Sequence, residues 1–215
     1  MLGIVSIEYI YPVLLASLGI LCISVIKGEH NFQKLFHSIN KEQSLFKNDF
    51  PSTMREQIIN AEDLFLIGVT LSRTIKTYNS AFIKKVKKGE RIRVLLIDPV
   101  GPAVDLAETR NYGRMDPNRT RQEIKSSIND LLEIKKYNPG YLSIRTIKNP
   151  LTHGVISINP HLSGGILFLE NYPYKTIGGS IPKFILQQGI DYWYDFFLEE
   201  AEILWNHGKE VQSAF

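Results

Sequence analysis

The sequence contains a single cysteine, Cys22, which lies inside an apolar run near the N-terminus. One cysteine cannot form a disulfide within the chain, and a zinc site built on cysteine ligands needs more than one. The composition therefore excludes a disulfide framework and a cysteine-based zinc site within this chain, and it agrees with a reducing compartment.

Several signatures of common enzyme classes are also missing. The sequence has no P-loop, no paired-glycine dinucleotide fingerprint and no H-E-x-x-H spacing among its five histidines, and Ser163 lacks the G-x-S-x-G context of a hydrolase nucleophile. We therefore expect no metal and no cofactor. The net charge of +3 is too small to indicate nucleic-acid binding by itself.

One long uncharged stretch is present, because residues 9–26 read YIYPVLLASLGILCISVI. At about 1.5 Å rise per residue, such a helix spans about 27 Å, close to a hydrocarbon core of about 30 Å. A cleaved signal peptide is disfavoured because no basic residue precedes the run, and a buried core helix is disfavoured because the run has no polar face. We predict a single-pass transmembrane anchor at residues 1–27, which contacts the bilayer through residues 4–26.

Lysines follow this run and none precedes it, so the positive-inside rule places the C-terminal domain in the cytoplasm. Residues 28–52 carry apolar side chains at helical spacing, and we interpret them as a juxtamembrane helical stalk or linker. This segment can pack on its own domain, pair with a second copy or lie along the lipid headgroups. Residues 53–215 form the predicted α/β domain.

A strand, a basic helix and a second strand open this domain. The run LFLIGVTL at residues 64–71 is typical of a strand covered on both faces, a helix from about residue 74 ends at Gly89, and RIRVLLI follows at residues 91–97. This order predicts two parallel strands, and ligands gather at the carboxyl ends of such strands. The residues expected at that edge are Thr70, Ser72, Arg73, Thr74 and Asp98.

The remaining elements complete a mixed, mostly parallel sheet flanked by helices. We expect helices at residues 103–109 and 118–136, and a last helix at 190–207 whose aromatic residues pack in the core. Strands are expected at residues 142–147, 155–158 and 166–169, and the last two form a hairpin through residues 159–165.

This order of elements resembles one half-module of the phospholipase D superfamily over residues 59–207. The resemblance rests on LFLIGVTLSRT (64–74), RVLLIDP (93–99), the Tyr172–Lys175 segment and the closing helix WYDFFLEEAEILW. It implies a mixed sheet flanked by helices. It also implies a homodimer, because single-copy members of that superfamily build their site across a twofold axis.

The catalytic signature of that superfamily is His-x-Lys-x4-Asp followed by a glycine-rich step. In such a site one histidine attacks phosphorus, its partner protonates the leaving oxygen and lysines hold the phosphoryl charge. Here His153 and Gly164–Gly165 match, but Val155 stands at the lysine position and Pro160 at the aspartate position. His153 is therefore the one candidate catalytic residue, and we favour a module without enzymatic activity.

These observations lead to one favoured function and two alternatives. The favoured function is a membrane-anchored, catalytically inactive sensor, regulatory or adaptor module for a phosphate-bearing small molecule, such as a nucleotide signal in bacterial stress or antiviral defence. The alternatives are an active phosphodiesterase (phospholipase or nuclease) that uses His153 across a dimer, and a structural subunit that binds a partner membrane protein. The predicted ligand-binding residues are Ser72, Arg73, Thr74, Asp98, Asn159, Glu170 and Tyr172.

Overall fold

The computed structural model describes residues 15–21, 23–25, 27–28, 46–47, 49–110, 116–175 and 181–213. The chain divides into two compact units, residues 1–45 and 46–215. In the first unit the described residues are helical and exposed, and no helix among the described residues is long and apolar enough to cross a membrane. Much of the predicted anchor and stalk lies outside the described residues, so both stay predictions.

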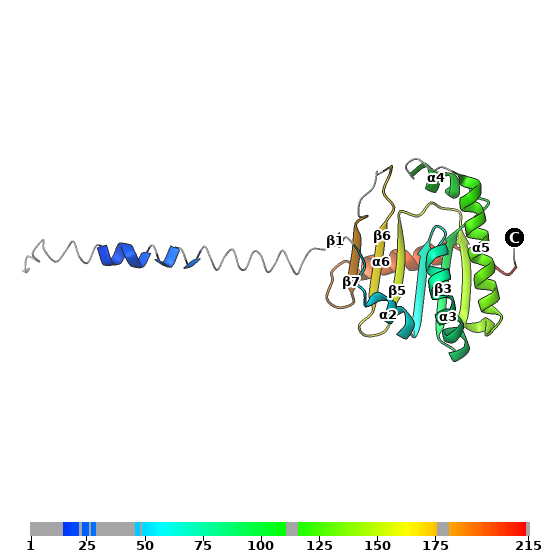
Figure 1. The fold of residues 1–215 in the computed structure, drawn as a ribbon, viewed down its shortest axis with the longest axis horizontal. Coiled ribbons are helices and arrows are strands. Elements are labelled where there is room, and N and C mark those ends of the chain that lie inside the picture. Colours follow the sequence, from blue (N-terminus) through cyan, green and yellow to red (C-terminus); the bar gives the residue numbers. More distant parts are fainter. Residues whose placement is uncertain are drawn as a thin grey trace, which may run out of the picture. The chain divides into compact units, whose positions relative to one another are not determined.

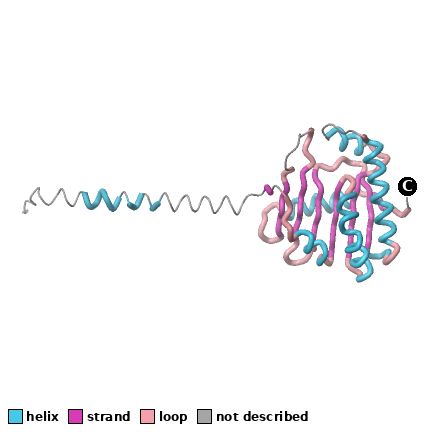
Figure 2. Tube along the Cα trace, in the orientation of Figure 1, coloured by secondary structure: helices cyan, strands magenta, loops and turns pink. Residues whose placement is uncertain are grey.

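In the described part of the second unit, eight strands form one sheet with helices on both faces (Figures 1 and 2). The strands are β1 (Phe46–Lys47), β2 (Asp63–Gly68), β3 (Arg91–Ile97), β4 (Leu142–Ile147), β5 (His153–Ile158), β6 (Ile166–Asn171), β7 (Lys183–Gln187) and β8 (Lys209–Glu210), and the helices are α2 (Met54–Asn60), α3 (Ser72–Lys88), α4 (Ala103–Arg110), α5 (Pro117–Lys135), the short 3₁₀ helix η1 (Pro139–Tyr141) and α6 (Tyr194–His207).

The strand order is β1-β7-β6-β5-β2-β3-β4-β8. Strands β2, β3 and β4 are mutually parallel, whereas all the other neighbours among the described strands pair antiparallel. The prediction of a mostly parallel sheet was therefore wrong. The connections after β5 and β6 are too short to carry a helical crossover, so each strand turns back beside its predecessor.

The predicted strand-helix-strand unit is confirmed. Strands β2 and β3 pair in parallel, and α3 ends at Gly89, whose φ of 81° suits the left-handed conformation that closes helices. Strand β2 is shorter than its apolar run, because residues 69–71 form the turn into α3. Leu71 in that turn has a φ of 47°, which is uncommon for a residue with a branched side chain.

Helix α6 covers the sheet face opposite α3 and α5 (Figure 1). Its Trp205 is buried and makes an edge-to-face contact with Phe65 of β2. The expectation that all its aromatic residues lie in the core was wrong, since Trp193 and Phe196 at its start are exposed. The buried residues of α6 (Tyr194, Leu198, Ala201 and Trp205) recur at helical spacing, and Trp193 and Phe196 lie outside this buried stripe.

Candidate functional site

A hollow lies at the carboxyl end of β2, on the sheet side that carries α3 and α5. We call it the α3 cavity; its volume is about 460 Å³. The turn after β2, the start of α3, the end of β6 and one face of α5 form its walls. The lining residues are Val69, Thr70, Leu71, Ser72, Arg73, Thr74, Glu123, Glu170 and Tyr172. Five predicted ligand-binding residues, Ser72, Arg73, Thr74, Glu170 and Tyr172, are thus brought together.

The start of α3 gives this cavity its positive end. The first backbone N–H groups of a helix have no intrahelical acceptors and carry the positive end of the helix dipole. The Thr70 hydroxyl accepts the Ser72 N–H at 3.3 Å, and no acidic residue stands in the first turn of α3. Arg73 is exposed and forms no ion pair with a described residue. This end of the cavity is therefore suited to an anion.

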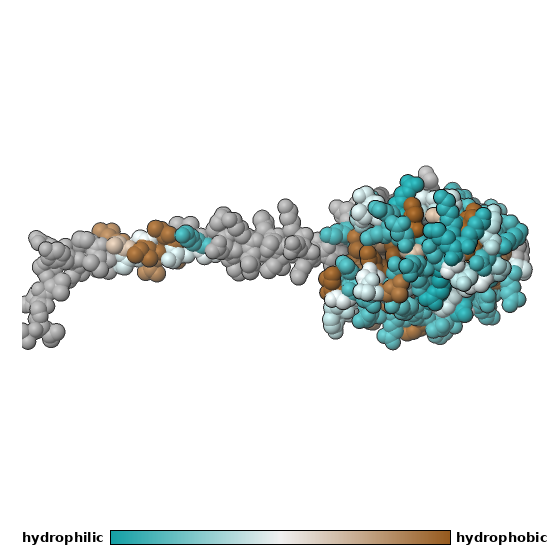
Figure 3. Space-filling view, turned by 90° about the horizontal axis from the view of Figure 1, so that it is seen from below, coloured by the Kyte–Doolittle hydropathy of each residue, from teal (hydrophilic) through white to brown (hydrophobic). Residues whose placement is uncertain are grey.

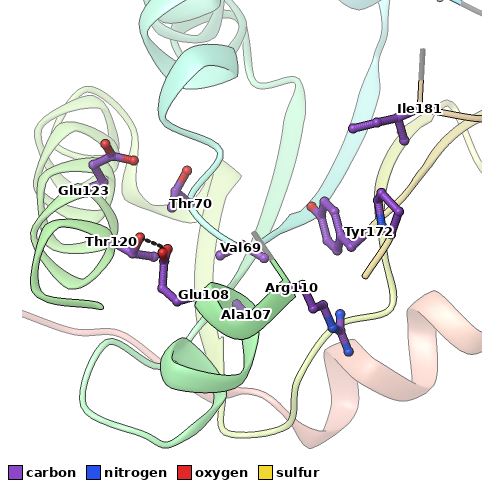
Figure 4. Close-up of a pocket in the computed structure, with 10 residues that line it drawn as sticks. Val69, Thr70, Ala107, Glu108, Arg110, Thr120, Glu123, Tyr172 and Ile181 are labelled. Atoms are coloured by element: carbon purple, nitrogen blue, oxygen red, sulfur yellow. Dashed lines mark hydrogen bonds between the residues drawn. The ribbon is translucent and has the colours of Figure 1, made fainter. Parts of the chain in front are cut away.

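A second hollow adjoins the first, and we call it the α4 cavity; its volume is about 350 Å³. The two cavities share Val69, Thr70, Glu123 and Tyr172, and we refer to them together as the cleft. Figure 4 shows Glu108, Thr120, Glu123 and Thr70 on one side of the α4 cavity and Tyr172, Ile181 and Arg110 on the other. The remaining lining residues are Ala107 and Pro173.

The acidic side of the α4 cavity is built by α4 and α5. Glu108 is buried, and its Oε1 accepts the hydroxyl of Thr120. Glu123 lies about one turn further along α5 from Thr120, and its Oε1 accepts from Arg119 at 3.1 Å on the exposed side. On the other wall, Arg110 donates to the carbonyl of Leu151. The α3 cavity therefore combines Arg73 and the start of α3 with the carboxylates of Glu123 and Glu170, and the α4 cavity combines Glu108 and Glu123 with Arg110.

Tyr172 stands between the two cavities. Burial raises the pKa of its phenol to about 12, although a backbone hydrogen bond with Val69 acts in the opposite direction. The phenol is therefore protonated at neutral pH. Gly154 on β5 allows this position, because a Cβ there would lie 2.6 Å from the Tyr172 oxygen.

Two predicted ligand-binding residues lie elsewhere. Asp98 follows β3 at the same edge of the sheet, but its carboxylate accepts the Val100 N–H and it does not line the cleft. Asn159 follows β5 at the opposite edge, where its side-chain oxygen accepts the N–H groups of Glu62 and Asp63. Both side chains therefore accept hydrogen bonds from backbone N–H groups, and the prediction that they line the ligand site was wrong.

His153 opens β5 near the cleft but faces α6 on the other side of the sheet. It is 7% exposed and makes an edge-to-face contact with Phe197, and its Nε2 lies 3.8 Å from Glu200. Burial lowers the pKa of His153, and the charge of Glu200 opposes that shift. The structure does not bring this histidine together with the residues of the cleft.

The sequence analysis missed the carboxylate-bearing half of the cleft. Two charged, polar helices carry the residues of this half, which are Glu108, Thr120 and Glu123. Polar residues in such helices are expected to be exposed to solvent. The one available signal is the spacing of Thr120 and Glu123, which places them on one helix face. Nothing in the sequence shows that this face meets Glu108.

No family model and no curated protein matches the sequence. Among solved structures, the archaeal chromatin protein TrmBL2, described as showing a novel mode of DNA binding, is 10% identical, with a TM-score of 0.45 over 95% of this chain and 70% of that chain. Nuc of Salmonella typhimurium, a phospholipase D family member, is 16% identical, with a TM-score of 0.38 over 74% of this chain and 91% of that chain. Both TM-scores are below 0.5, and these similarities carry no argument about function.

Proposed function

We propose that this chain is a ligand-binding module whose cleft takes a phosphate-bearing small molecule. The observation that carries the proposal is the meeting of Arg73 with the start of α3 in one cavity. A guanidinium and helix N-terminal N–H groups are common phosphate ligands in proteins, and each suits a doubly charged oxyanion. The hydroxyls of Ser72 and Thr74 add further donors to the same wall.

The module acts as a sensor or adaptor rather than as an enzyme. A group that attacks phosphorus or transfers a proton must reach the substrate, and His153 packs against Phe197 on the opposite face of the sheet. Val155 and Pro160 replace the lysine and aspartate of the phospholipase D signature. A phosphate held in the cleft is therefore bound without being cleaved.

The cellular setting of this function rests on the sequence. The apolar run in residues 4–26 and the lysines that follow it support a membrane anchor with the cytoplasm on the C-terminal side. The phospholipase D resemblance supports a homodimer and a role in bacterial stress or antiviral signalling. In this proposal, the bound ligand changes how two copies or a partner membrane protein associate.

The test uses the full chain in mild detergent and reads melting temperature and phosphodiester cleavage in parallel. The compounds are inorganic phosphate, nucleotides, cyclic oligonucleotides and phospholipids. A ligand at a hundredfold excess over its Kd stabilises the folded state by about 2.7 kcal/mol. We expect a melting shift without cleavage for at least one compound.

The variant Arg73→Ala separates the cleft from other binding surfaces. We expect it to weaken phosphate binding by about tenfold or more, because a charge-assisted hydrogen bond contributes about 1.5–3 kcal/mol. Its matched control is Arg55→Ala, since Arg55 is exposed on α2, away from the cleft. Equal binding by the two variants contradicts the proposal, and cleavage that disappears in His153→Ala makes the chain a phosphodiesterase.

A second candidate function is assembly through α6. Tyr192, Trp193 and Phe196 form a row of edge-to-face contacts, and Tyr192 is 87% and Phe196 55% exposed. Exposed aromatic groups of this kind are enriched at protein interfaces. Sedimentation of Trp193→Ser and Phe196→Ser checks this candidate: an assembly that dissociates in these variants and persists in Arg73→Ala supports a structural subunit.

A further inference from the structure

The α4 cavity contains a buried carboxylate that has no cationic partner among the described residues. Glu108 is 5% exposed, and its Oε1 accepts the Thr120 hydroxyl. Its second oxygen forms no hydrogen bond with a described residue, and it is not one of the fully buried side-chain atoms that lack a partner. A carboxylate oxygen that borders a cavity can accept an N–H from a bound molecule. The described part of the cavity wall gives Glu108 one neutral donor, so its second oxygen can accept another.

The rest of the cavity wall indicates which kind of donor group could bind to Glu108. Glu123, which pairs with Arg119 at 3.1 Å, adds a second carboxylate. The guanidinium of Arg110 donates to the Leu151 carbonyl, and Figure 4 shows Arg110 across the cavity from Glu123. Across the cavity lie the ring of Tyr172 and the apolar side chain of Ile181. Two carboxylates facing an aromatic ring favour a group with N–H donors, charged or neutral, on an apolar or planar frame.

The described residues near the cavity offer no arrangement for a metal ion. Among them, no three His, Cys, Asp or Glu side chains stand close enough to hold one. Glu108 and Glu123 are two carboxylates without a third ligand of that kind, and the hydroxyl between them belongs to Thr120. An organic donor group therefore fits the cavity better than a divalent cation does.

We infer that the α4 cavity binds the nitrogen-bearing end of the same small molecule whose phosphate lies in the α3 cavity. This inference rests on the proposed function. The ligand is a phosphate monoester that carries an amine or an exocyclic amino group at its other end. Arg73 and the start of α3 hold the phosphate, and Glu108 and Glu123 accept the N–H groups. Both amino sugar phosphates and amino-substituted nucleotides have this chemistry.

Two matched pairs of compounds test the inference on the full chain by calorimetric titration. The first pair is glucosamine 6-phosphate and glucose 6-phosphate, and the second is AMP and purine riboside 5′-monophosphate. The members of each pair differ at the amino group, so the pair that shows a difference identifies the source of the donor. We expect the amino member of one pair to bind about tenfold tighter, since hydrogen bonds to charged groups are the stronger ones.

Two variants locate the effect. Glu108→Gln keeps an acceptor for Thr120, and Glu123→Gln changes a half-exposed side chain whose substitution leaves the core intact. We expect both to reduce the preference for the amino member. Inorganic phosphate should bind Glu108→Gln as before, because Glu108 does not line the α3 cavity, whereas Glu123→Gln removes a carboxylate from that cavity and should bind phosphate at least as tightly as the original protein does. Melting temperatures measured without ligand show that the variants are folded.

The outcomes separate this inference from the proposed function. If phosphate binding is lost in Arg73→Ala but both members of each pair bind equally, the inference fails and the proposed function stands. A preference that survives both glutamate variants also overturns the inference. If adenosine or glucosamine binds through Glu108 while no phosphate compound gains from its phosphate, the proposed function fails and the assignment of the α4 cavity remains.

Discussion

The two ends of strand β2 differ in how their polar groups are satisfied. At the amino end, Asn159 accepts the backbone N–H groups of Glu62 and Asp63 at 2.8 and 3.0 Å and donates its own N–H to the Asp63 carbonyl at 2.8 Å. Arg91 forms a two-point ion pair with the Asp63 carboxylate. Protein groups therefore satisfy each other at this end.

A buried lysine completes the network at the amino end. Lys85 is 2% exposed, and its ammonium donates to the Ala61 carbonyl and, at 3.0 Å, to Glu90. Burial lowers the pKa of Lys85, although Glu90 opposes that shift. Figure 3 views the molecule from this edge of the sheet, where the surface is largely hydrophilic with separate apolar patches.

The carboxyl end shows the opposite arrangement. Neither Arg73 nor the buried Glu108 forms an ion pair with a described residue, and both side chains line cavities. Glu123 and Glu170 also line the cavity that contains Arg73. Charged groups that a fold leaves without protein partners around a hollow are the usual mark of a ligand site. One end of β2 is thus closed by contacts between protein groups, and the other keeps the two cavities that the proposed function assigns to a ligand.

The largest expected effect is on the stability of the closed end. Lys85→Ala removes the buried partner of an ion pair, leaves the Ala61 carbonyl without its donor, and leaves Glu90 with Lys88 alone at 3.8 Å, so we expect a loss of about 3 kcal/mol in unfolding free energy. Urea denaturation measures it. Lys84→Ala, an exposed neighbour on α3, is the control and should change little. Equal stability of the two variants would break the comparison.

A somewhat smaller loss is expected for Asn159→Ala. Two backbone N–H groups lose their acceptor, and the φ of 50° at this position suits asparagine better than alanine, so we expect a loss of about 2 kcal/mol. Asn159→Asp keeps an acceptor oxygen and should lose less. If Asn159→Ala instead keeps its stability and weakens ligand binding, Asn159 belongs to a site and the amino end is not closed.

The variant Gly154→Ala tests the open end through packing. The new Cβ would meet the Tyr172 oxygen at 2.6 Å, and the resulting overpacking should cost about 1–2 kcal/mol. We also expect weaker binding in the cleft, because the ring that separates the two cavities must move. Adding Tyr172→Phe should recover part of the stability. Gly140→Ala, where a Cβ has no neighbour within 4 Å, is the thermal-melt control.

The smallest expected effect is the pH dependence of stability caused by His153, which lies on the sheet face covered by α6. The pKa of His153 is lowered in the folded state, so the unfolded chain binds more protons between the folded pKa and about 6.5. The contribution of His153 to the free energy of unfolding is therefore complete above about pH 6.5. It falls as the pH drops below that value, by at most about 1.4 kcal/mol per pH unit.

His153→Leu should remove this component of the pH dependence and leave phosphate binding unchanged. Urea denaturation of both proteins between pH 7.5 and 5 checks the first result, and titration with inorganic phosphate checks the second. The His161–Glu202 ion pair is common to the two proteins, so the difference between them isolates the contribution of His153. Loss of phosphate binding in His153→Leu would place the histidine in the site and sharpen the case for an enzyme.

The sequence by itself determined the elements at the centre of the domain. Apolar runs predicted β2, β3 and β4, Gly89 predicted the end of α3, and the order strand-helix-strand predicted the parallel pair and the edge at which Arg73 lies. These features depend on local periodicity and on the handedness of chain connections, which short stretches of sequence carry. The position of Ser72, Arg73 and Thr74 at that edge followed from the same reasoning.

The tertiary structure decided what the remaining polar residues do. Asn159, Asp98 and His153 have the residue types of a site, and each is directed to a backbone group or to α6. From the sequence, Glu108 and Glu123 are expected at the surface. In the structure, α4 and α5 lie beside the turn after β2, and both glutamates line a cavity there. Residue type and spacing set what a side chain can bind, but long-range packing sets whether a protein group or a ligand binds it.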